Sequence, residues 1–230
     1  MIITIDGPIA TGKTTIAKNL AGKIGFIYFE TGAMYRCATL ALIRAGIDFR
    51  DEQMVADFMS HYDFDMRIHR RECRYYLENQ DVTEEIRGHP VTNAVSAIAA
   101  LPVVRQRLVA IQRTMAEGIN AVFEGRDMGT AVFPNAYLKV FLTGKEEVRA
   151  RRRYEEVCRR FPLEAEQITY EQVKREIAER DAYDTGRLTS PLRQPEDALV
   201  IDTSDMTIDE VVQLVIDYKD DMKVAQESKE

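Results

Sequence analysis

Short apolar runs alternate with segments of helical periodicity along most of the chain. These runs are rich in β-branched and aromatic residues and cover residues 2–5, 26–29, 121–123, 138–142 and 199–201. Residues 14–24, between the first two runs, place Ile16, Leu20 and Ile24 on one helical stripe before Gly25. Because strands that alternate with helices pair in parallel, the pattern predicts an α/β fold with a doubly wound parallel sheet flanked by helices.

Residues 37–120 interrupt this alternation, since they are far more than one crossover helix needs. Apolar and polar residues alternate over 64–68, and residues 73–77 follow Arg70-Arg71-Glu72, which predicts an antiparallel hairpin. Two helical segments follow, one on each side of Leu101-Pro102.

This interruption predicts two domains. We expect a core made of residues 1–36 and 121–225, which carries residues 37–120 as an inserted subdomain with a small antiparallel sheet. Near the end of the chain, Thr207 stands three residues before Glu210 and apolar residues follow at helical spacing. This capping box predicts a final helix.

Composition and charge narrow the class of protein. The 230 residues are 45% hydrophobic and 30% charged, which suits a packed core. Acidic residues outnumber basic ones, 38 to 31, and the net charge of −7 argues against a surface that binds nucleic acid or anionic membrane. No apolar run approaches the roughly 18 residues of a membrane span, no signal peptide is recognisable, and the three cysteines have no disulfide or zinc spacing. We therefore expect a cytoplasmic protein without membrane or nucleic-acid partners.

Gly7-Pro8-Ile9-Ala10-Thr11-Gly12-Lys13-Thr14 matches the pattern G-x-x-x-x-G-K-[ST] in full. The motif stands directly after a predicted strand and before a predicted helix, which is the context that it requires. Its glycines let backbone N–H groups converge on a phosphate at the positive end of the helix. Lys13 is suited to bridge β- and γ-phosphates and the Thr14 hydroxyl to reach Mg²⁺, so the motif predicts a nucleoside triphosphate site.

Four arginines, Arg36, Arg126, Arg180 and Arg187, are expected at turns and helix starts. Planar guanidinium groups are preferred bidentate partners of phosphate, so together they suggest a second phosphate pocket. The chain has no N-K-x-D segment of a GTPase and no L-S-G-G-Q-like signature of an ABC-type ATPase. A small phosphorylated acceptor is therefore expected.

Three further motifs carry a resemblance to a known family. Thr31-Gly32-Ala33-Met34-Tyr35-Arg36, Glu124-Gly125-Arg126-Asp127-Met128-Gly129-Thr130 and Arg180-Asp181-x-x-Asp184-x-x-Arg187 resemble the bacterial cytidylate kinases. These are P-loop nucleoside monophosphate kinases with an enlarged monophosphate-binding insert, and the resemblance runs from residue 2 to about residue 218. It implies transfer of the ATP γ-phosphoryl group to CMP and dCMP, with Mg²⁺, and a CMP-binding role for residues 37–120.

The resemblance also implies site residues. ATP would be held by Gly7, Pro8, Ile9, Ala10, Thr11, Gly12, Lys13, Thr14, Thr15 and, from a lid at about 149–170, Arg152. The CMP phosphate would be bound by Arg36, Arg126 and Arg187 with Thr31 nearby, cytosine by Ser96, Arg105 and Asp127, and the sugar and its phosphate by Arg180 and Asp184. Lys13, Arg126 and Arg180 would act on the transferring phosphoryl group.

Three positions depart from the family pattern. Ala10 and Thr11 stand where the family often has Gly and a small residue, which stiffens the loop. Glu124 stands at a strand end where the family usually has Asp, and its extra methylene shifts the carboxylate that would hold Mg²⁺ through water. Thr31 replaces a Ser and keeps the hydroxyl.

The reaction needs no general base, because a phosphate monoester has a second pKa of about 6 and is largely ionised at neutral pH. His61, His69 and His89 accordingly fall outside every motif. Two alternatives remain open: a P-loop kinase for another small acceptor such as UMP or AMP, and a nucleotide-binding regulatory module. We expect small nucleotides as the partners and a monomer as the oligomeric state.

Overall fold

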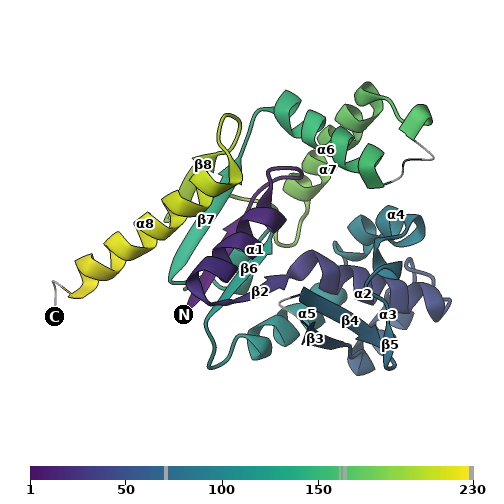
Figure 1. Cartoon of the computed structure of the whole chain (residues 1–230). Coiled ribbons are helices and arrows are strands. Elements are labelled where there is room, and N and C mark those ends of the chain that lie inside the picture. The colour runs from purple at the N-terminus through teal and green to yellow at the C-terminus, as the bar shows by residue number, and fades with distance from the viewer. Residues whose placement is uncertain (70–71, 161, 163–164, 228–230) are drawn as a thin grey trace. The chain divides into compact units, whose positions relative to one another are not determined.

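The computed structural model describes residues 1–69, 72–160, 162 and 165–227. The chain divides into two compact units, which Figure 1 shows in the colours of the chain order. Unit 1 comprises Met1–Tyr28 and Ile119–Glu230, and unit 2 comprises Phe29–Gly118.

A five-stranded sheet has the order β2-β6-β1-β7-β8. Its strands are β1 (Ile2–Asp6), β2 (Ile27–Glu30), β6 (Ala121–Gly125), β7 (Leu138–Thr143) and β8 (Leu199–Asp202). Strand β1 pairs in parallel with both β6 and β7, and β7 pairs in parallel with β8. The five apolar runs of the sequence are these strands, and the predicted α/β class with a parallel sheet is confirmed.

Two helices, α1 (Lys13–Ile24) and α8 (Ile208–Glu227), lie side by side in unit 1 (Figure 1). They form one apolar core with the sheet, to which Ile5, Leu20 and Val215 contribute fully buried side chains. The Thr207 amide donates to Glu210 Oε2 over 2.8 Å, and the Glu210 amide donates to Thr207 Oγ1 over 3.3 Å. The predicted capping box at the start of α8 is therefore confirmed.

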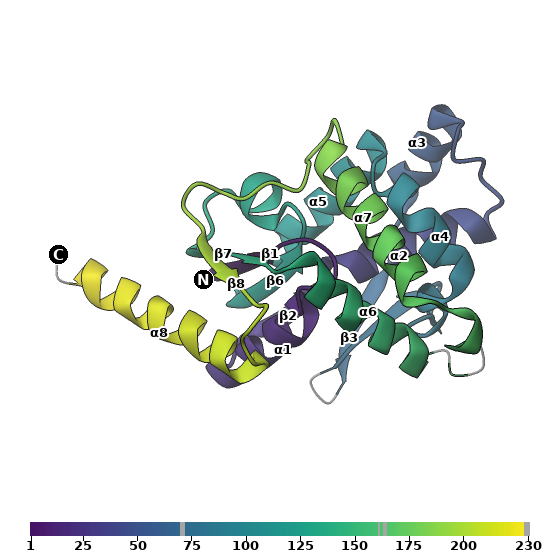
Figure 2. The same cartoon turned by 90° about the horizontal axis from the view of Figure 1, so that it is seen from above.

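A second pair of helices, α6 (Glu146–Arg160) and α7 (Tyr170–Gly186), packs together in unit 1 (Figure 2). Ala150, Val173 and Ile177 form a small core between them. The short helices η3 (Ala165–Gln167) and η2 (Met128–Val132) complete this unit. Residues 161, 163 and 164 of the expected lid lie outside the described residues.

The described residues of unit 2 form a three-stranded antiparallel sheet and four longer helices. Its elements are α2 (Thr31–Arg44), α3 (Glu52–His61), β3 (Asp65–His69), β4 (Glu72–Leu77), β5 (Gln80–Asp81), η1 (Glu85–Arg87), α4 (His89–Ile98) and α5 (Pro102–Met115). Strand β3 pairs with β4 so that Arg67 faces Arg74. The predicted hairpin and the two helices around Leu101-Pro102 are confirmed, while residues 70 and 71 of its turn lie outside the described residues.

Among the residues that the structure describes, no single helix has the length and apolar composition to cross a membrane. The pair α4 and α5, bent by 98°, passes that test by length and composition alone. Its apolar residues Val95, Ile98, Val104 and Leu108 belong to the buried core of unit 2.

Candidate active site

The P-loop connects β1 to α1 within unit 1, and glycines make its path possible. Gly7 has φ 150°, and a Cβ atom there would lie 2.2 Å from the Leu142 carbonyl oxygen. Gly12 precedes α1 with φ 86°. The N–H groups of the first helical turn lack acceptors within the helix, so they are available to an anion at this end of α1.

Ala10 also adopts a left-handed backbone, with φ 61°. This conformation is unfavourable for a residue with a Cβ atom. The sequence predicted a stiffer loop at Ala10. The positive φ adds a steric cost, because the Cβ atom of Ala10 is crowded in this backbone conformation.

Lys13 is buried in unit 1, with 5% of its surface exposed, and its Nζ donates to the Pro8 carbonyl oxygen over 2.5 Å. Burial, with a smaller contribution from the charge of Arg126, lowers the pKa of Lys13 to about 7, although Glu124 and Asp6 act in the opposite direction. A nearby polyanion favours the charged amine. The Lys13 site is therefore suited to a phosphate ligand that restores its charge.

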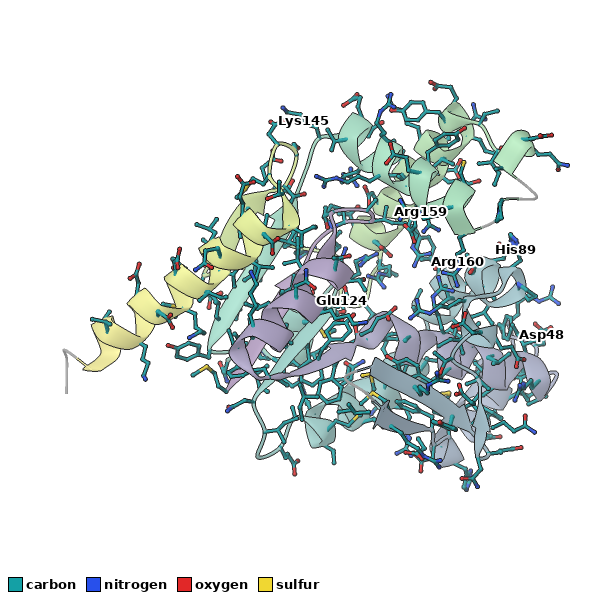
Figure 3. The ribbon with its side chains drawn as sticks, viewed as in Figure 1. Asp48, His89, Glu124, Lys145, Arg159 and Arg160 are labelled. Carbon is teal, nitrogen blue, oxygen red and sulfur yellow. The ribbon has the colours of Figure 1, made fainter. Side chains whose placement is uncertain are left out.

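Thr14 and Glu124 bring two oxygen ligands together at the start of α1. The Thr14 hydroxyl donates to Glu124 Oε1 over 3.1 Å, and Glu124, labelled in Figure 3, lies at the end of β6 next to α1. The described residues contain no cluster of three or more His, Cys, Asp or Glu suited to a metal ion. Mg²⁺ often binds proteins through only one or two carboxylates and takes its other ligands from water and substrate phosphate, so this pair fits that ion.

Asp184 is a buried carboxylate, with 2% of its surface exposed, at the centre of an arginine cluster in unit 1. Arg126 Nε donates to Asp184 Oδ2 over 2.9 Å, while Arg180 Nε and Arg187 Nη2 lie 3.7 Å from its oxygens. Burial raises the pKa of Asp184, but the three arginines together hold it below its ordinary value. Three cations around one anion leave an excess of positive charge, which suits a phosphate group.

Two of the four arginines are not at a turn or helix start, and one of them is Arg36, which lies beyond the first turn of α2 (Thr31–Arg44). Arg180 was expected at a turn or helix start, but it lies in the interior of α7. The helix begins after Thr169, whose side chain accepts from the Gln172 amide, and it continues to Gly186 without a break. Arg126 follows β6 and Arg187 follows α7, as expected of turn residues.

The predicted site residues of unit 2 lie on α2, α4 and α5. Arg36 Nη1 donates to Thr92 Oγ1 over 2.9 Å and to the Ile86 carbonyl oxygen over 3.1 Å. Arg105, of which 3% is exposed, donates to the Ala99 carbonyl oxygen over 3.2 Å and lies 5.4 Å from the centre of the Tyr35 ring.

Two further predicted residues belong to this unit. Thr31 is buried at the start of α2, and Ser96 lies half-buried in α4. Helix α2 packs against both α4 and α5.

Arg152, the arginine expected at ATP, binds the segment after β8. Its guanidinium donates to Thr203 Oγ1 over 3.0 Å and to the Thr203 carbonyl oxygen over 2.6 Å. The Thr203 hydroxyl also donates to the Thr11 carbonyl oxygen over 3.2 Å. Thr203 was absent from the sequence predictions, and no motif marks it.

Asp6 was also missed. It ends β1 directly before the P-loop, is 1% exposed, and accepts hydrogen bonds from the Met128 and Gly129 amides over 2.9 and 2.7 Å. Asp6 thus holds the turn that carries Arg126 and Asp127. An acid at the end of a strand immediately before a P-loop was the available signal.

Comparisons with known proteins agree with this geometry. The cytidylate kinase family model matches residues 3–221. A protein named cytidylate kinase from Protochlamydia amoebophila is 53% identical over 99% of this chain and 100% of its own length. Another of that name, from Geobacillus thermodenitrificans, is 43% identical over 94% of each chain.

A solved structure supports the fold alone. An uncharacterised protein from Eubacterium ventriosum superposes with a TM-score of 0.52 at 13% identity, over 96% of this chain and 98% of that chain. Together with the family match over nearly the whole length, the P-loop and the arginine cluster lead to one assignment. The chain belongs to the cytidylate kinase family.

Proposed function

We propose that the protein transfers the γ-phosphoryl group of ATP to CMP, and to dCMP, giving ADP and CDP or dCDP. The observation that carries this proposal is that unit 1 holds both a complete P-loop and the arginine cluster around Asp184. A P-loop binds the phosphates of the donor, and a cluster of guanidinium groups is suited to the phosphate of a second nucleotide.

Residues 7–15 and Arg152 bind ATP in this proposal. The P-loop amides and the positive end of α1 hold the β- and γ-phosphates. Lys13 exchanges its bond to the Pro8 carbonyl oxygen for contacts with the phosphates and stabilises the charge that moves during transfer. Lys13 should bind the ATP phosphates more strongly than the Pro8 carbonyl oxygen, because the phosphates are charged and the carbonyl is neutral.

Mg²⁺ would be held by the Thr14 hydroxyl and, through water, by Glu124. The ion supplies neutralisation of the phosphate charge when it is bound. The hydrogen bond between Thr14 and Glu124 orients both oxygen ligands before the ion binds.

The proposed acceptor phosphate is bound by Arg36, Arg126, Arg180 and Arg187. Asp184 holds three of these arginines. Since a carboxylate can accept about four hydrogen bonds, Asp184 can also accept one from a sugar hydroxyl. Thr31 offers a further hydroxyl to the phosphate. Arg126 and Arg180, with Lys13, are the proposed catalytic residues, since they act on the transferring group.

Asp127, Ser96 and Arg105 recognise cytosine in this proposal. A carboxylate suits the cytosine amino group, and an arginine suits the ring acceptors. Asp127 is 2% exposed and Arg105 is 3% exposed. Groups this well buried discriminate strongly between cytosine and other bases, because a mismatched base leaves them without hydrogen-bond partners.

No general base is required, since the acceptor phosphate is largely ionised at neutral pH. The three histidines lie in unit 2, on α3, β3 and α4. The protein's chemical contribution is to hold two polyanions in line and to exclude water. We propose a monomer that acts on small nucleotides in the cytoplasm, where the thiols of Cys37, Cys73 and Cys158 stay reduced.

The test is a coupled assay of ADP release with CMP, dCMP, UMP, AMP and shikimate as acceptors. We expect the highest kcat/KM with CMP or dCMP. A preference for UMP or AMP would identify a kinase for a different monophosphate. ATP binding without turnover on any acceptor would instead identify a nucleotide-binding regulatory module.

A further inference from the structure

One P-loop residue, Ile9, has both of its backbone polar groups bound by the helices α6 and α7. The Ile9 amide donates to Asp181 Oδ1 over 3.2 Å, and the Ile9 carbonyl oxygen accepts from Arg149 Nη1 over 3.1 Å. The same Arg149 nitrogen forms an ion pair with Asp181 Oδ2. These bonds join the P-loop to α6 through Arg149 and to α7 through Asp181.

The pair of Arg149 and Asp181 is largely shielded from water. Their side chains are 10% and 20% exposed, and Arg149 Nε makes an additional bond to the Gly144 carbonyl oxygen over 3.0 Å. Ile9 and Ala10 pack their side chains against the small core between α6 and α7. Charged hydrogen bonds in such surroundings are stronger than those on an open surface.

The carbonyl group that Arg149 holds belongs to the peptide between Ile9 and Ala10. Rotation about φ of Ala10, which is 61°, changes the direction of that peptide relative to the rest of the loop. Ala10 would relieve its steric cost by leaving the left-handed region. Arg149 and Asp181 oppose this relaxation, because it would pull the Ile9 carbonyl and amide away from them.

We propose that Asp181 and Arg149 are positioning residues that hold the P-loop in its strained, triphosphate-binding conformation. The proposal rests on the ATP-dependent function proposed above. Helix α7 also carries Arg180 and Asp184, so the same contact keeps the loop that binds ATP in register with the arginine cluster. Asp181 belongs to a motif quoted from the sequence, but no role was assigned to it.

The test is a double-mutant cycle between Asp181 and Ala10, read by direct titration of ATP with Mg²⁺ and by steady-state kinetics. Asp181→Ala should weaken ATP binding about tenfold or more, as expected for loss of a charged, partly buried hydrogen-bond partner. In a protein that also carries Ala10→Gly, the same change should cost clearly less. Glycine adopts positive φ without a steric penalty, so the loop no longer needs to be held.

This dependence on residue 10 separates positioning from general stabilisation. Loss of a merely structural ion pair would weaken ATP binding by the same factor in both backgrounds, and that result would overturn the proposal. Unchanged ATP affinity in Asp181→Ala would overturn it as well. Thermal melting of each variant shows how much of any loss reflects unfolding.

Asp197→Asn is the matched control, since it breaks another ion pair of unit 1, with Lys139 over 2.8 Å, that includes no residue of the P-loop. Its ATP affinity should match that of the wild-type protein. Arg149→Lys is the second variant if Asp181→Ala does not fold. Lysine keeps the charge but loses the fork that reaches Ile9, Gly144 and Asp181 together, so ATP binding should weaken here too, and again the loss should be smaller in the Ala10→Gly background.

The experiment also separates this proposal from the proposed function. ATP titration measures binding and does not depend on the acceptor, so the cycle can be read even if CMP is not phosphorylated. Normal CMP phosphorylation together with additive effects at residues 10 and 181 would remove the positioning role and leave the function intact.

Discussion

The Thr14 hydroxyl donates a hydrogen bond to Glu124 Oε1 over 3.1 Å, from the first turn of α1 to the end of β6. The longer acid at position 124 therefore reaches the P-loop directly. Both groups are oxygen ligands of the type that Mg²⁺ prefers. Their contact makes the proposed metal role of Glu124 open to test.

Glu124→Gln keeps the acceptor for Thr14 but removes the negative charge. We expect a rise of about tenfold in the Mg²⁺ concentration needed for half-maximal activity, as for other residues that support a bound metal. The affinity for ATP without Mg²⁺ should change little. The measurement is activity against free Mg²⁺ at saturating ATP and CMP.

Glu124→Asp is the control, because it keeps the charge and restores the acid usual in the family. Its Mg²⁺ dependence should stay close to that of the wild-type protein. An unchanged Mg²⁺ requirement in Glu124→Gln would show that Glu124 only orients Thr14.

Lys13→Ala should lower kcat by on the order of 10²-fold or more, since it removes a charge that stabilises the transferring phosphoryl group. CMP binding should weaken far less, which calorimetric titration of CMP can show. Lys18→Ala, an exposed position of the same helix, should leave kcat unchanged. Near-normal turnover of Lys13→Ala would contradict a catalytic P-loop.

Arg187→Lys keeps the positive charge next to Asp184 but loses the planar fork. We expect a higher KM for CMP and a lower kcat/KM for this substrate, with little change in KM for ATP. Arg193→Lys, at an exposed position of the following loop, is the matched control. If KM for ATP rises and KM for CMP does not, Arg187 belongs to the ATP site.

The fold was predictable where sequence signals are local. Apolar runs marked the five strands, and the P-loop motif placed Lys13 and Thr14 at the start of α1. The alternating residues before position 70, together with the run 73–77 after the polar break, predicted β3 and β4. In each case the signal and the structure lie within a few residues of one another.

The remaining features depend on contacts between distant segments. Helix α7 begins at Tyr170, well before the motif, and continues to Gly186, so Arg180 lies in its interior and the expectation of a turn was wrong. Asp181 bonds to Ile9 across 172 positions of the chain. The residues around Asp181 do not indicate this contact, and Arg149 was expected only as the first residue of the lid, so the sequence did not predict that both residues bind Ile9.

Asp127→Ala tests base recognition. It should lower kcat/KM for CMP and narrow the advantage of CMP over UMP, because each mismatched buried group costs about 1–3 kcal/mol. ATP affinity should remain nearly unchanged. The measurement is kcat/KM for both acceptors in both proteins, and an unchanged CMP to UMP ratio would leave base recognition to Ser96 and Arg105.

Asp6 predicts how stability depends on pH. Burial raises the pKa of Asp6 from 3.8 to about 7, although the bonds from the Met128 and Gly129 amides lower it. Between about pH 4 and pH 7 the folded protein therefore keeps a proton on Asp6 that the unfolded chain has released. Over this window the free energy of unfolding should fall as the pH rises, by at most about 1.4 kcal/mol per pH unit from this group.

Asp6→Asn removes this ionisation while keeping the size of the side chain. Urea unfolding of both proteins at several values between about pH 4.5 and pH 7.5, a range set around the raised pKa, measures the difference in stability. The wild-type protein should lose stability relative to Asp6→Asn as the pH rises to about 7, and the difference should level off above it. Lys13 is present in both proteins, so its own effect, a gain in stability from about pH 7 upward, largely cancels in the comparison. Parallel profiles across the whole range would show that Asp6 is ionised in the folded protein at every pH tested, and that its two amide hydrogen bonds outweigh the cost of its burial.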